Sequence, residues 1–165
     1  MFWIKLWYHF TALLQFGFYK LVYGGSLKIG KKVTWRRGFF VMKDKAAVVA
    51  IGDGCFFNND CSIAANRCVA IGSGTLFGEN VKIYDHNHRF RDAALPLKAQ
   101  GFADGEVHIG QNCWIGSNAV ILKGADIGDR CVIGAGCVID GKVPADTIVK
   151  RSAAQLQLPI ERSKK

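Results

Sequence analysis

Two histidines and an aspartate stand together at the point where a regular pattern in the chain breaks off. Residues 83–88 read Ile-Tyr-Asp-His-Asn-His, so Asp85 precedes His86 directly and His88 follows two positions later. A neutral imidazole can take a proton from a hydroxyl near neutral pH, and either histidine could therefore act as a general base. The same residues could instead be polar members of a turn that bond only to backbone groups. The spacing alone leaves both interpretations open.

The pattern that breaks off at residue 84 has a period of six. Isoleucine opens six consecutive hexapeptides between residues 109 and 144, and a small or medium apolar residue follows each by four positions. The isoleucines are Ile109, Ile115, Ile121, Ile127, Ile133 and Ile139. Neither an α-helix nor an ordinary strand has this period, whereas a chain that turns a corner every six residues does. Three hexapeptides then make one triangular coil whose flat sides are parallel strands, about 4.8 Å from those of the next coil.

The same repeat is visible earlier in the chain. It occupies residues 51–63 and 71–83, with two extra residues near Asn66 and Arg67 that predict a bulged corner. Residues 84–106 interrupt it and are expected to form a loop on one face, where solenoid proteins often bind ligands. Residues 35–49 show no clear repeat, so we expect an irregular, strand-rich segment there.

Composition limits the partners and the compartment. The chain has 165 residues and a net charge of +9, which favours an anionic partner such as nucleic acid, anionic lipid or a polyphosphate ligand. It carries no nucleic-acid-binding motif, so no nucleic-acid partner is expected. Five of its six cysteines fall on the small inward position of the repeat: Cys55, Cys61, Cys113, Cys131 and Cys137. We interpret them as buried, reduced thiols of a cytoplasmic protein.

Residues 1–23 are rich in apolar and aromatic residues with helical spacing. One arc of the helical wheel is more polar than the rest and contains Lys5, Tyr8, His9, Ala12, Gln15, Tyr19 and Lys20. The segment is interrupted too often by such residues for a membrane span. Two interpretations remain open: the helix caps the β-coils or packs on a neighbouring subunit, or it lies on a membrane surface.

Taken together, the coils and the histidine segment resemble the hexapeptide-repeat acyltransferases, above all the polysaccharide O-acetyltransferases and the maltose and galactoside acetyltransferases. The resemblance runs from about Ile51 to Val149 and is most specific at residues 80–88, 114–117 and 133–136. It implies an all-β fold, a left-handed parallel β-helix with an N-terminal amphipathic helix and a protruding loop. We expect the helix in residues 1–25, the β-helix with loop 84–106 in residues 26–150, and a tail in residues 151–165.

The resemblance also implies an activity: direct transfer of an acetyl group from acetyl-CoA to a sugar hydroxyl, with no metal. Carried over position by position, it makes His86 the general base and lets His88 orient the acceptor or His86. Residues matching the acetyl-CoA site are Trp114, Ser117, Gly134, Ala135 and Gly136, with Lys142, Lys150 and Arg151 at the nucleotide end. Asp60 and Asp85 are expected acceptor contacts. The backbone N–H of Ser117 would stabilise the oxyanion.

The resemblance also implies an oligomeric state and binding partners. They imply a homotrimer with active sites between adjacent β-helices, and a sugar or glycan acceptor, free or lipid-linked, in cell-surface polysaccharide synthesis. The basic charge and aromatic N-terminus suggest contact with the inner face of the membrane through residues 1–23. Two other functions stay open: a zinc lyase of the carbonic-anhydrase type, for which His86, His88 and His108 are the only plausible ligands, and a scaffold without catalysis.

Overall fold

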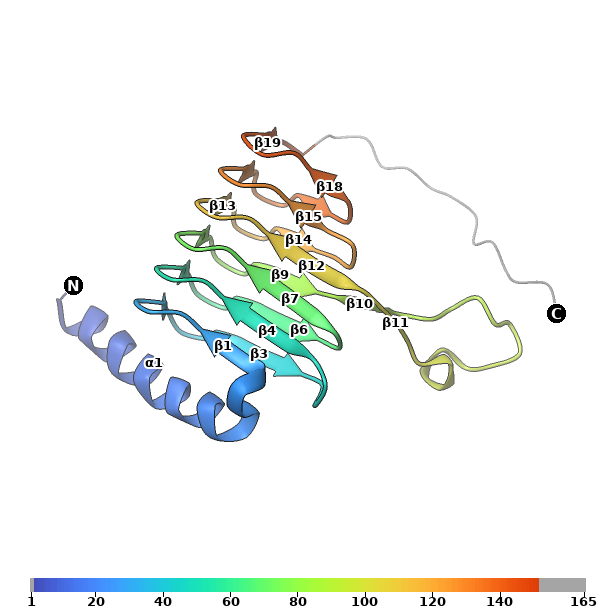
Figure 1. Cartoon of the computed structure of the whole chain (residues 1–165), viewed down its shortest axis with the longest axis horizontal. Coiled ribbons are helices and arrows are strands. Elements are labelled where there is room, and N and C mark those ends of the chain that lie inside the picture. The colour runs from blue at the N-terminus through green and yellow to red at the C-terminus, as the bar shows by residue number, and fades with distance from the viewer. Residues whose placement is uncertain (1, 152–165) are drawn as a thin grey trace.

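The computed structural model describes residues 2–151, which form a triangular solenoid with one helix across its N-terminal end (Figure 1). The helix α1 is Phe2–Tyr23, and a 3₁₀ turn, Gly24–Ser26, connects it to the coils. Sheet A contains β1 (Leu27–Ile29), β4 (Val48–Ile51), β7 (Cys68–Ile71), β12 (Glu106–Ile109), β15 (Asp126–Ile127) and β18 (Lys142–Val143). Sheet B contains β2 (Thr34–Trp35), β5 (Phe56–Phe57), β8 (Leu76–Phe77), β13 (Trp114–Ile115), β16 (Val132–Ile133) and β19 (Ile148–Val149). Sheet C contains β3 (Phe40–Lys43), β6 (Ser62–Ala65), β9 (Lys82–Tyr84), β14 (Val120–Ile121) and β17 (Val138–Ile139).

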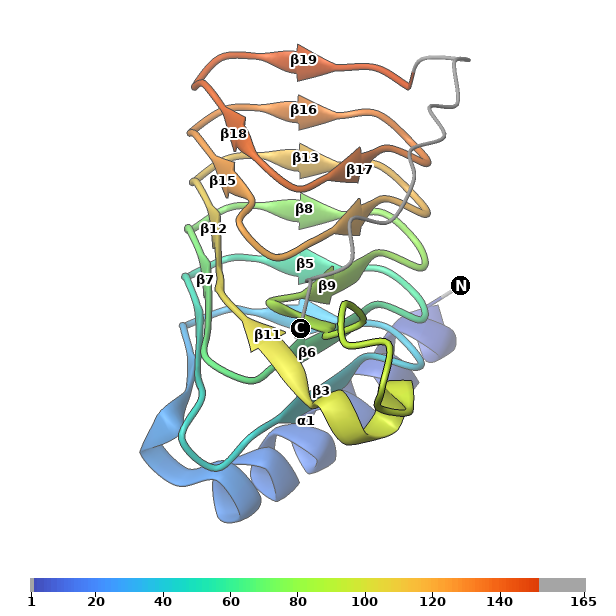
Figure 2. The same cartoon turned by 90° about the vertical axis from the view of Figure 1, so that its right-hand side faces the viewer.

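The isoleucines of the repeat stack from one coil to the next. Ile109 pairs with Ile127, Ile115 with Ile133 and Ile121 with Ile139, in parallel strands. All six of these side chains are buried, and the inward cysteines are buried between them. The coils rise from the N-terminal to the C-terminal end in the left-handed sense (Figure 2). The fold class predicted from the sequence is therefore confirmed.

Three rows of turns join the sheets, and we name each row after the sheets that it connects. The AB edge follows sheet A, the BC edge follows sheet B, and the CA edge follows sheet C. Each turn of the BC edge places one residue at positive φ, where glycine, asparagine and aspartate are tolerated best: Gly38, Asp60, Asn80, Asn118 and Gly136. The repeat thus requires these residue types at its corners, independently of any function.

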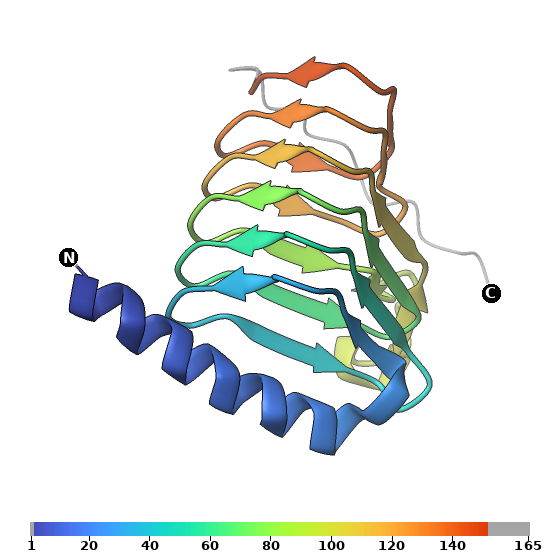
Figure 3. The ribbon, with the colours of Figure 1, turned by 60° about the vertical axis from the view of Figure 1, so that its left-hand side comes forward.

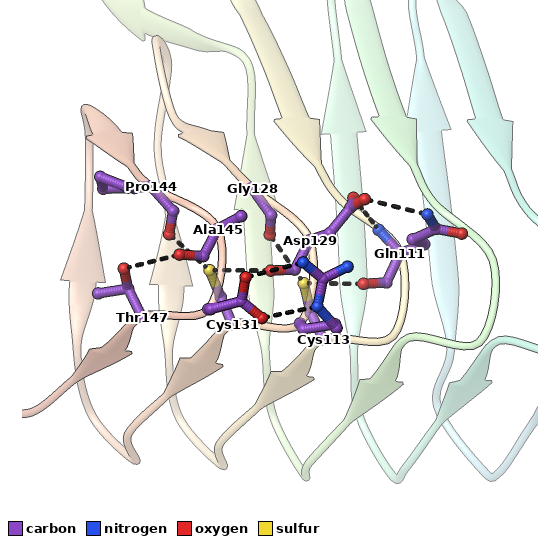
Figure 4. A network of polar contacts seen from close by, with 10 residues as sticks. Gln111, Cys113, Gly128, Asp129, Cys131, Pro144, Ala145 and Thr147 are labelled. Atoms are coloured by element: carbon purple, nitrogen blue, oxygen red, sulfur yellow. Dashed lines mark hydrogen bonds and ion pairs between the residues drawn. The ribbon is translucent and has the colours of Figure 1, made fainter.

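Buried thiols and one hydroxyl bond to the carbonyls of the AB edge. Thr75 Oγ1 donates to Gly110 O at 2.9 Å, Cys113 Sγ lies 3.2 Å from Gly128 O, and Cys131 Sγ lies 3.0 Å from Pro144 O. Figure 4 shows the upper part of this ladder beside the Gln111–Asp129 pair. Cysteine and threonine therefore play one structural part here, satisfying a corner carbonyl of the next coil.

The first coil is regular, which corrects the expectation of an irregular segment at residues 35–49. Its strands β2 and β3 pair in register with β5 and β6 of the second coil, and β4, which opens the second coil, pairs with β7. The repeat is hidden because aromatic residues replace its isoleucine at Trp35, Phe57 and Phe77 and its small residue at Phe39. The four rings form a continuous stack with centroid separations of 5.1, 4.6 and 4.4 Å. Below Phe39 there is no further coil, so α1 fills that space.

The loop leaves the solenoid at the CA edge of the third coil and returns in the fourth. Its two arms form an antiparallel hairpin, β10 (His86–His88) with β11 (Phe102–Asp104), followed outward by a 3₁₀ turn at Leu97–Gln100. Figure 1 shows the hairpin projecting from the stack. The stack itself is uninterrupted, because β12 pairs with β7 in full register, Val107 with Val69 and Ile109 with Ile71.

Candidate active site

His86 is the first residue of the hairpin and is held by its neighbour. Its Nδ1 lies 2.9 Å from Asp85 Oδ1, and only 14% of its side chain is exposed. Phe102, on the opposite arm, packs edge-on against the imidazole at a centroid distance of 5.1 Å. His86 also lines a small cavity of about 230 Å³ with residues at the ends of β3 and β6.

Asp85 fixes the tautomer of His86. Its carboxylate is fully buried and accepts N–H bonds from the bulged corner, Asn66 to Oδ1 at 2.8 Å and Arg67 and Cys68 to Oδ2 at 2.7 and 2.8 Å. Surrounded by donors, it acts as an acceptor toward His86, so Nδ1 carries the proton. Nε2 then presents a lone pair and has no partner among residues 2–151, as a general base requires.

The position of Asp85 differs from the expected contact with an acceptor. A fully buried carboxylate with four donors leaves no surface for a sugar hydroxyl. Asp85 instead joins the two extra residues of the corner to the catalytic candidate. His88, expected beside His86, is exposed and packs on Phe102 at a centroid distance of 4.5 Å.

The residues expected to hold acetyl-CoA gather on another part of the solenoid, with one exception. Ser117 lies on the BC edge in the fourth coil, Gly134, Ala135 and Gly136 lie there in the fifth, and Lys150 and Arg151 follow β19 in the sixth. Trp114 is next to this edge on the outer face of sheet B, with 58% of its surface exposed. The exception is Lys142, which lies on sheet A beside Asp126, away from this group.

The backbone N–H of Ser117 is without a partner in the described part of the chain. One coil below, the equivalent backbone N–H, that of Glu79, donates to Ser117 Oγ at 3.1 Å. There, a side chain of the coil above satisfies the amide. Above Ser117 the corresponding residue is Ala135, whose methyl group cannot accept a hydrogen bond. The amide is therefore available for a ligand oxygen.

Asp60 occupies the BC edge in the second coil. Its φ of 62° makes it one of the left-handed corner residues, and its carboxylate lies 3.9 Å from Arg37. The preceding residue, Asn59, was not predicted as a site residue. Its Oδ1 is the one buried side-chain polar atom without a partner among the described residues, although its Nδ2 donates to Glu79 at 3.1 Å. Only the fold distinguishes Asn59 from the other asparagines of the corners.

Within one chain, the histidine and the BC edge cannot act on the same atom. The BC and CA edges lie at opposite ends of sheet C, and the five steps from Ser117 to Leu122 span roughly 16 Å at 3.3 Å each. Their heights along the solenoid, however, are complementary. Asp60 belongs to the second coil, His86 follows the third and Ser117 belongs to the fourth.

The alternative zinc site is not assembled. His108 lies on the outer face of sheet A, where its Nε2 is 3.1 Å from Glu106. His86 is bonded to Asp85, and no group of three or more histidine, cysteine, aspartate or glutamate side chains in residues 2–151 is placed to hold a metal ion.

Comparisons with known proteins agree with the repeat and the fold. The family profile described as "Bacterial transferase hexapeptide (six repeats)" matches residues 106–141. The putative lipopolysaccharide biosynthesis O-acetyl transferase WbbJ of Escherichia coli K12 is 28% identical, over 92% of this chain and 81% of that protein. The galactoside O-acetyltransferase of Escherichia coli K12 is 31% identical over 61% of this chain, which spans only about half (48%) of that relative.

A solved structure extends the similarity to nearly the whole described fold. The hexapeptide-repeat acetyltransferase VCA0836 of Vibrio cholerae superimposes with a TM-score of 0.70 at 25% identity, over 91% of this chain and 81% of that one. The same protein has been solved in complex with acetyl-CoA, with a TM-score of 0.68 over 82% of this chain and 70% of that one. The repeat, the coil architecture and these relatives make the chain similar to the hexapeptide-repeat acetyltransferases.

Proposed function

We propose that this protein transfers an acetyl group from acetyl-CoA directly to a sugar hydroxyl, with His86 as general base. One observation carries the proposal: His86 presents an unpartnered Nε2, held in one tautomer by a buried carboxylate. Nε2 takes the proton of the hydroxyl as its oxygen attacks the thioester carbonyl. The CoA thiolate then leaves and recovers that proton, so no acyl-enzyme forms.

The proposed site lies between two copies of the chain. In a cyclic oligomer, parallel solenoids stand at equal height, so His86 of one copy can approach the BC edge of the next. The third coil is one spacing, about 4.8 Å, above Asp60 and one below Ser117. His86 would then stand between an acceptor at Asp60 and Asn59 and a thioester at the Ser117 amide.

The outer surfaces of the sheets support side-by-side packing into a homotrimer. Sheets B and C, which flank the BC edge, expose Leu76, Trp114, Ile148, Phe40, Met42 and Val138. Sheet A carries polar residues on the corresponding face, among them Lys28, His108, Asp126 and Lys142. The two apolar faces therefore favour contact between copies, and the polar one favours solvent.

The donor's proposed path runs up the BC edge. Trp114 would cover the acetyl and pantetheine groups, and the backbone at Gly134, Ala135 and Gly136 would allow close approach. At Gly136 an added Cβ would meet only the Arg151 side chain, at 3.5 Å, so this corner is open. Lys150 and Arg151 would lie against the phosphates of CoA.

The acceptor is proposed to be a glycan unit of cell-surface polysaccharide synthesis, in keeping with the name of WbbJ. We propose that it is lipid-linked and that α1 keeps the enzyme at the inner face of the membrane. His88 and the second arm of the hairpin would border the acceptor, since the loop cavity of about 520 Å³ is lined by His88, Arg89, Arg91 and Lys123 among others.

The test is release of CoA thiol with a panel of sugars and lipid-linked glycans. Wild type is expected to turn over, His86→Ala to lose activity, and His88→Ala to keep part of it. Equal turnover by wild type and His86→Ala would refute the assignment of the base. Release from neither protein, together with no binding of CoA, would refute the transferase.

Mixed oligomers test the location of the site. His86→Ala and Ala135→Glu, which places a negative charge on the donor path, are each expected to be inactive alone. Co-expressed in equal amounts they should recover about a quarter of wild-type activity, because one site in four combines an intact histidine with an intact edge from another copy. A site within a single chain would recover none.

A further inference from the structure

The helix α1 turns its more polar arc toward the solenoid and leaves its apolar arc uncovered. Gln15, Tyr19 and Tyr23 bond to the backbone of the first coil, for example Gln15 Nε2 to Phe39 O and Tyr23 OH to Val41 O at 3.1 Å. The opposite arc exposes Trp7, Phe10, Leu13, Leu14, Phe18 and Leu21, each by more than half of its surface. A helix that only capped the coils would do the reverse.

The exposed arc is a continuous stripe at the end of the solenoid. Trp7, Phe10, Leu14, Phe18 and Leu21 follow one another at intervals of three or four residues, and Leu21 is 85% exposed. Figure 3 shows α1 running across the whole N-terminal end. Contiguous apolar surface of this kind on a folded protein marks an interaction site.

The charge next to the stripe identifies the partner. Residues 20–47 contain eight cationic side chains and one acidic one, Asp44, a net +7 of the chain's +9. The eight are Lys20, Lys28, Lys31, Lys32, Arg36, Arg37, Lys43 and Lys45, and all except Lys43 are well exposed. The first coil therefore forms a basic ring directly beside the apolar stripe. An apolar stripe bordered by lysine and arginine is the pattern of a helix lying in an anionic lipid surface.

We propose that this end of the protein docks on an anionic lipid surface, with the apolar arc of α1 in the headgroup–acyl boundary and the basic ring against the lipid phosphates. A second copy of the chain fits the same end less well, because end-to-end contact would bring two basic rings together. No helix in residues 2–151 is long and apolar enough to cross a membrane.

The proposed trimer would strengthen this docking, and that part of the inference rests on the proposed function. Cyclic symmetry places all three α1 helices at the same end, so one flat surface can bind them together, which multiplies the apparent affinity. The third coil, with His86, would stand roughly 10 Å beyond the first coil. The catalytic level would thus be close to the plane from which a lipid-linked acceptor projects.

Vesicle co-sedimentation tests the proposal without reference to acetyl transfer. The full-length protein should bind vesicles of phosphatidylcholine with phosphatidylglycerol, bind pure phosphatidylcholine more weakly, and lose affinity as salt rises. Leu14→Glu should weaken binding at least roughly ten- to hundredfold, the partition of one leucine side chain. Its control is Leu97→Glu, a comparably exposed apolar residue on the hairpin loop, outside α1 and outside the apolar faces of sheets B and C, which should bind like wild type.

The charge contribution has its own matched pair. Lys28 and Lys142 lie on the same outer face of sheet A, at opposite ends of the stack. Lys28→Ala should weaken binding to anionic vesicles about fivefold, whereas Lys142→Ala should leave it unchanged. Acetyl transfer to a water-soluble acceptor should survive Leu14→Glu, which separates membrane docking from catalysis.

Three results would overturn the inference. Unchanged vesicle binding by Leu14→Glu would remove the helix from the contact. Equal effects of Lys28→Ala and Lys142→Ala would mean that vesicle binding depends only on the net charge of the protein and not on the basic ring. Absence of vesicle binding by wild type, with a smaller mass for Leu14→Glu in analytical ultracentrifugation, would make the stripe an interface between copies instead.

Discussion

Replacing Asp85 by asparagine should damage both the fold and the chemistry. The amide has nearly the same shape as the carboxylate, but one of its two oxygens becomes an NH₂ group. Two donors face each oxygen: Asn66 N and His86 Nδ1 at Oδ1, and Arg67 N and Cys68 N at Oδ2. Whichever way the amide turns, its NH₂ group meets donors, and at least one buried backbone N–H loses its partner.

The size of the effect follows from these contacts. An unsatisfied buried donor costs about 1–3 kcal/mol, and bonds to a charged acceptor contribute about 1.5–3 kcal/mol, so Asp85→Asn should lower the free energy of unfolding by about 2–5 kcal/mol. If the NH₂ group turns toward His86, it stabilises the tautomer with the proton on Nε2. That histidine cannot act as a base, and kcat should fall by about 10³–10⁴.

Denaturant unfolding and steady-state kinetics measure the two effects separately. The control is Asp104→Asn on the opposite arm of the hairpin, whose exposed carboxylate accepts one bond, from Asn66 Nδ2 at 3.1 Å. It should change stability by less than about 0.5 kcal/mol. If Asp85→Asn unfolds at the same denaturant concentration as wild type, or keeps its kcat, the positioning argument fails.

Three further predictions follow from other parts of the fold. Thr75→Val leaves Gly110 O and Cys113 N without their partner and should destabilise the protein by about 2–4 kcal/mol. Thr75→Cys should cost less, because cysteine fills the same place in neighbouring coils. Calorimetry of the two variants measures the difference, and equal losses of stability would contradict this row of hydrogen bonds. Burial raises the pKa of the Cys55, Cys61, Cys68 and Cys113 thiols, but Cys68 is the one cysteine that is only partly buried. A thiol reagent at pH 8 should therefore modify Cys68 first and all six cysteines only after unfolding. Rapid native modification of Cys113 would argue against this packing. Trp114→Ala should raise KM for acetyl-CoA about tenfold or more while leaving stability within about 0.5 kcal/mol, since its side chain is exposed; an unchanged KM would place the donor elsewhere.

Much of the architecture could be predicted because one period fixes so many residues. The spacing of the isoleucines determines which side chains face inward and which coil lies on which, and all six are buried as predicted. The bulge near Asn66 was also visible, as two residues too many. The sequence did not reveal that the amides of this bulge bind Asp85. Asp85 is about 19 residues away and meets the bulge only because β6 pairs with β9.

The remaining errors have physical causes too. The repeat escaped detection in residues 35–49 because the first coil packs on a helix instead of another coil, and Phe39 therefore replaces a small residue. Helical periodicity identified α1 but could not tell which arc faces the solenoid, since aromatic hydroxyls and one glutamine serve as its contacts. Lys142 was grouped with Lys150 and Arg151 by sequence distance, although a corner of the coil separates it from them.

The uninterrupted pairing of β7 with β12 makes the hairpin loop a separate unit of variation. Residues 85–105 are inserted between β9 and β12, yet β12 pairs with β7 of the coil below in full register. Changes in the length or sequence of this loop can therefore alter the surroundings of His86 without changing the spacing of the coils or the BC edge above. An enzyme built in this way can acquire a new acceptor through one short insertion while it inherits its donor site intact.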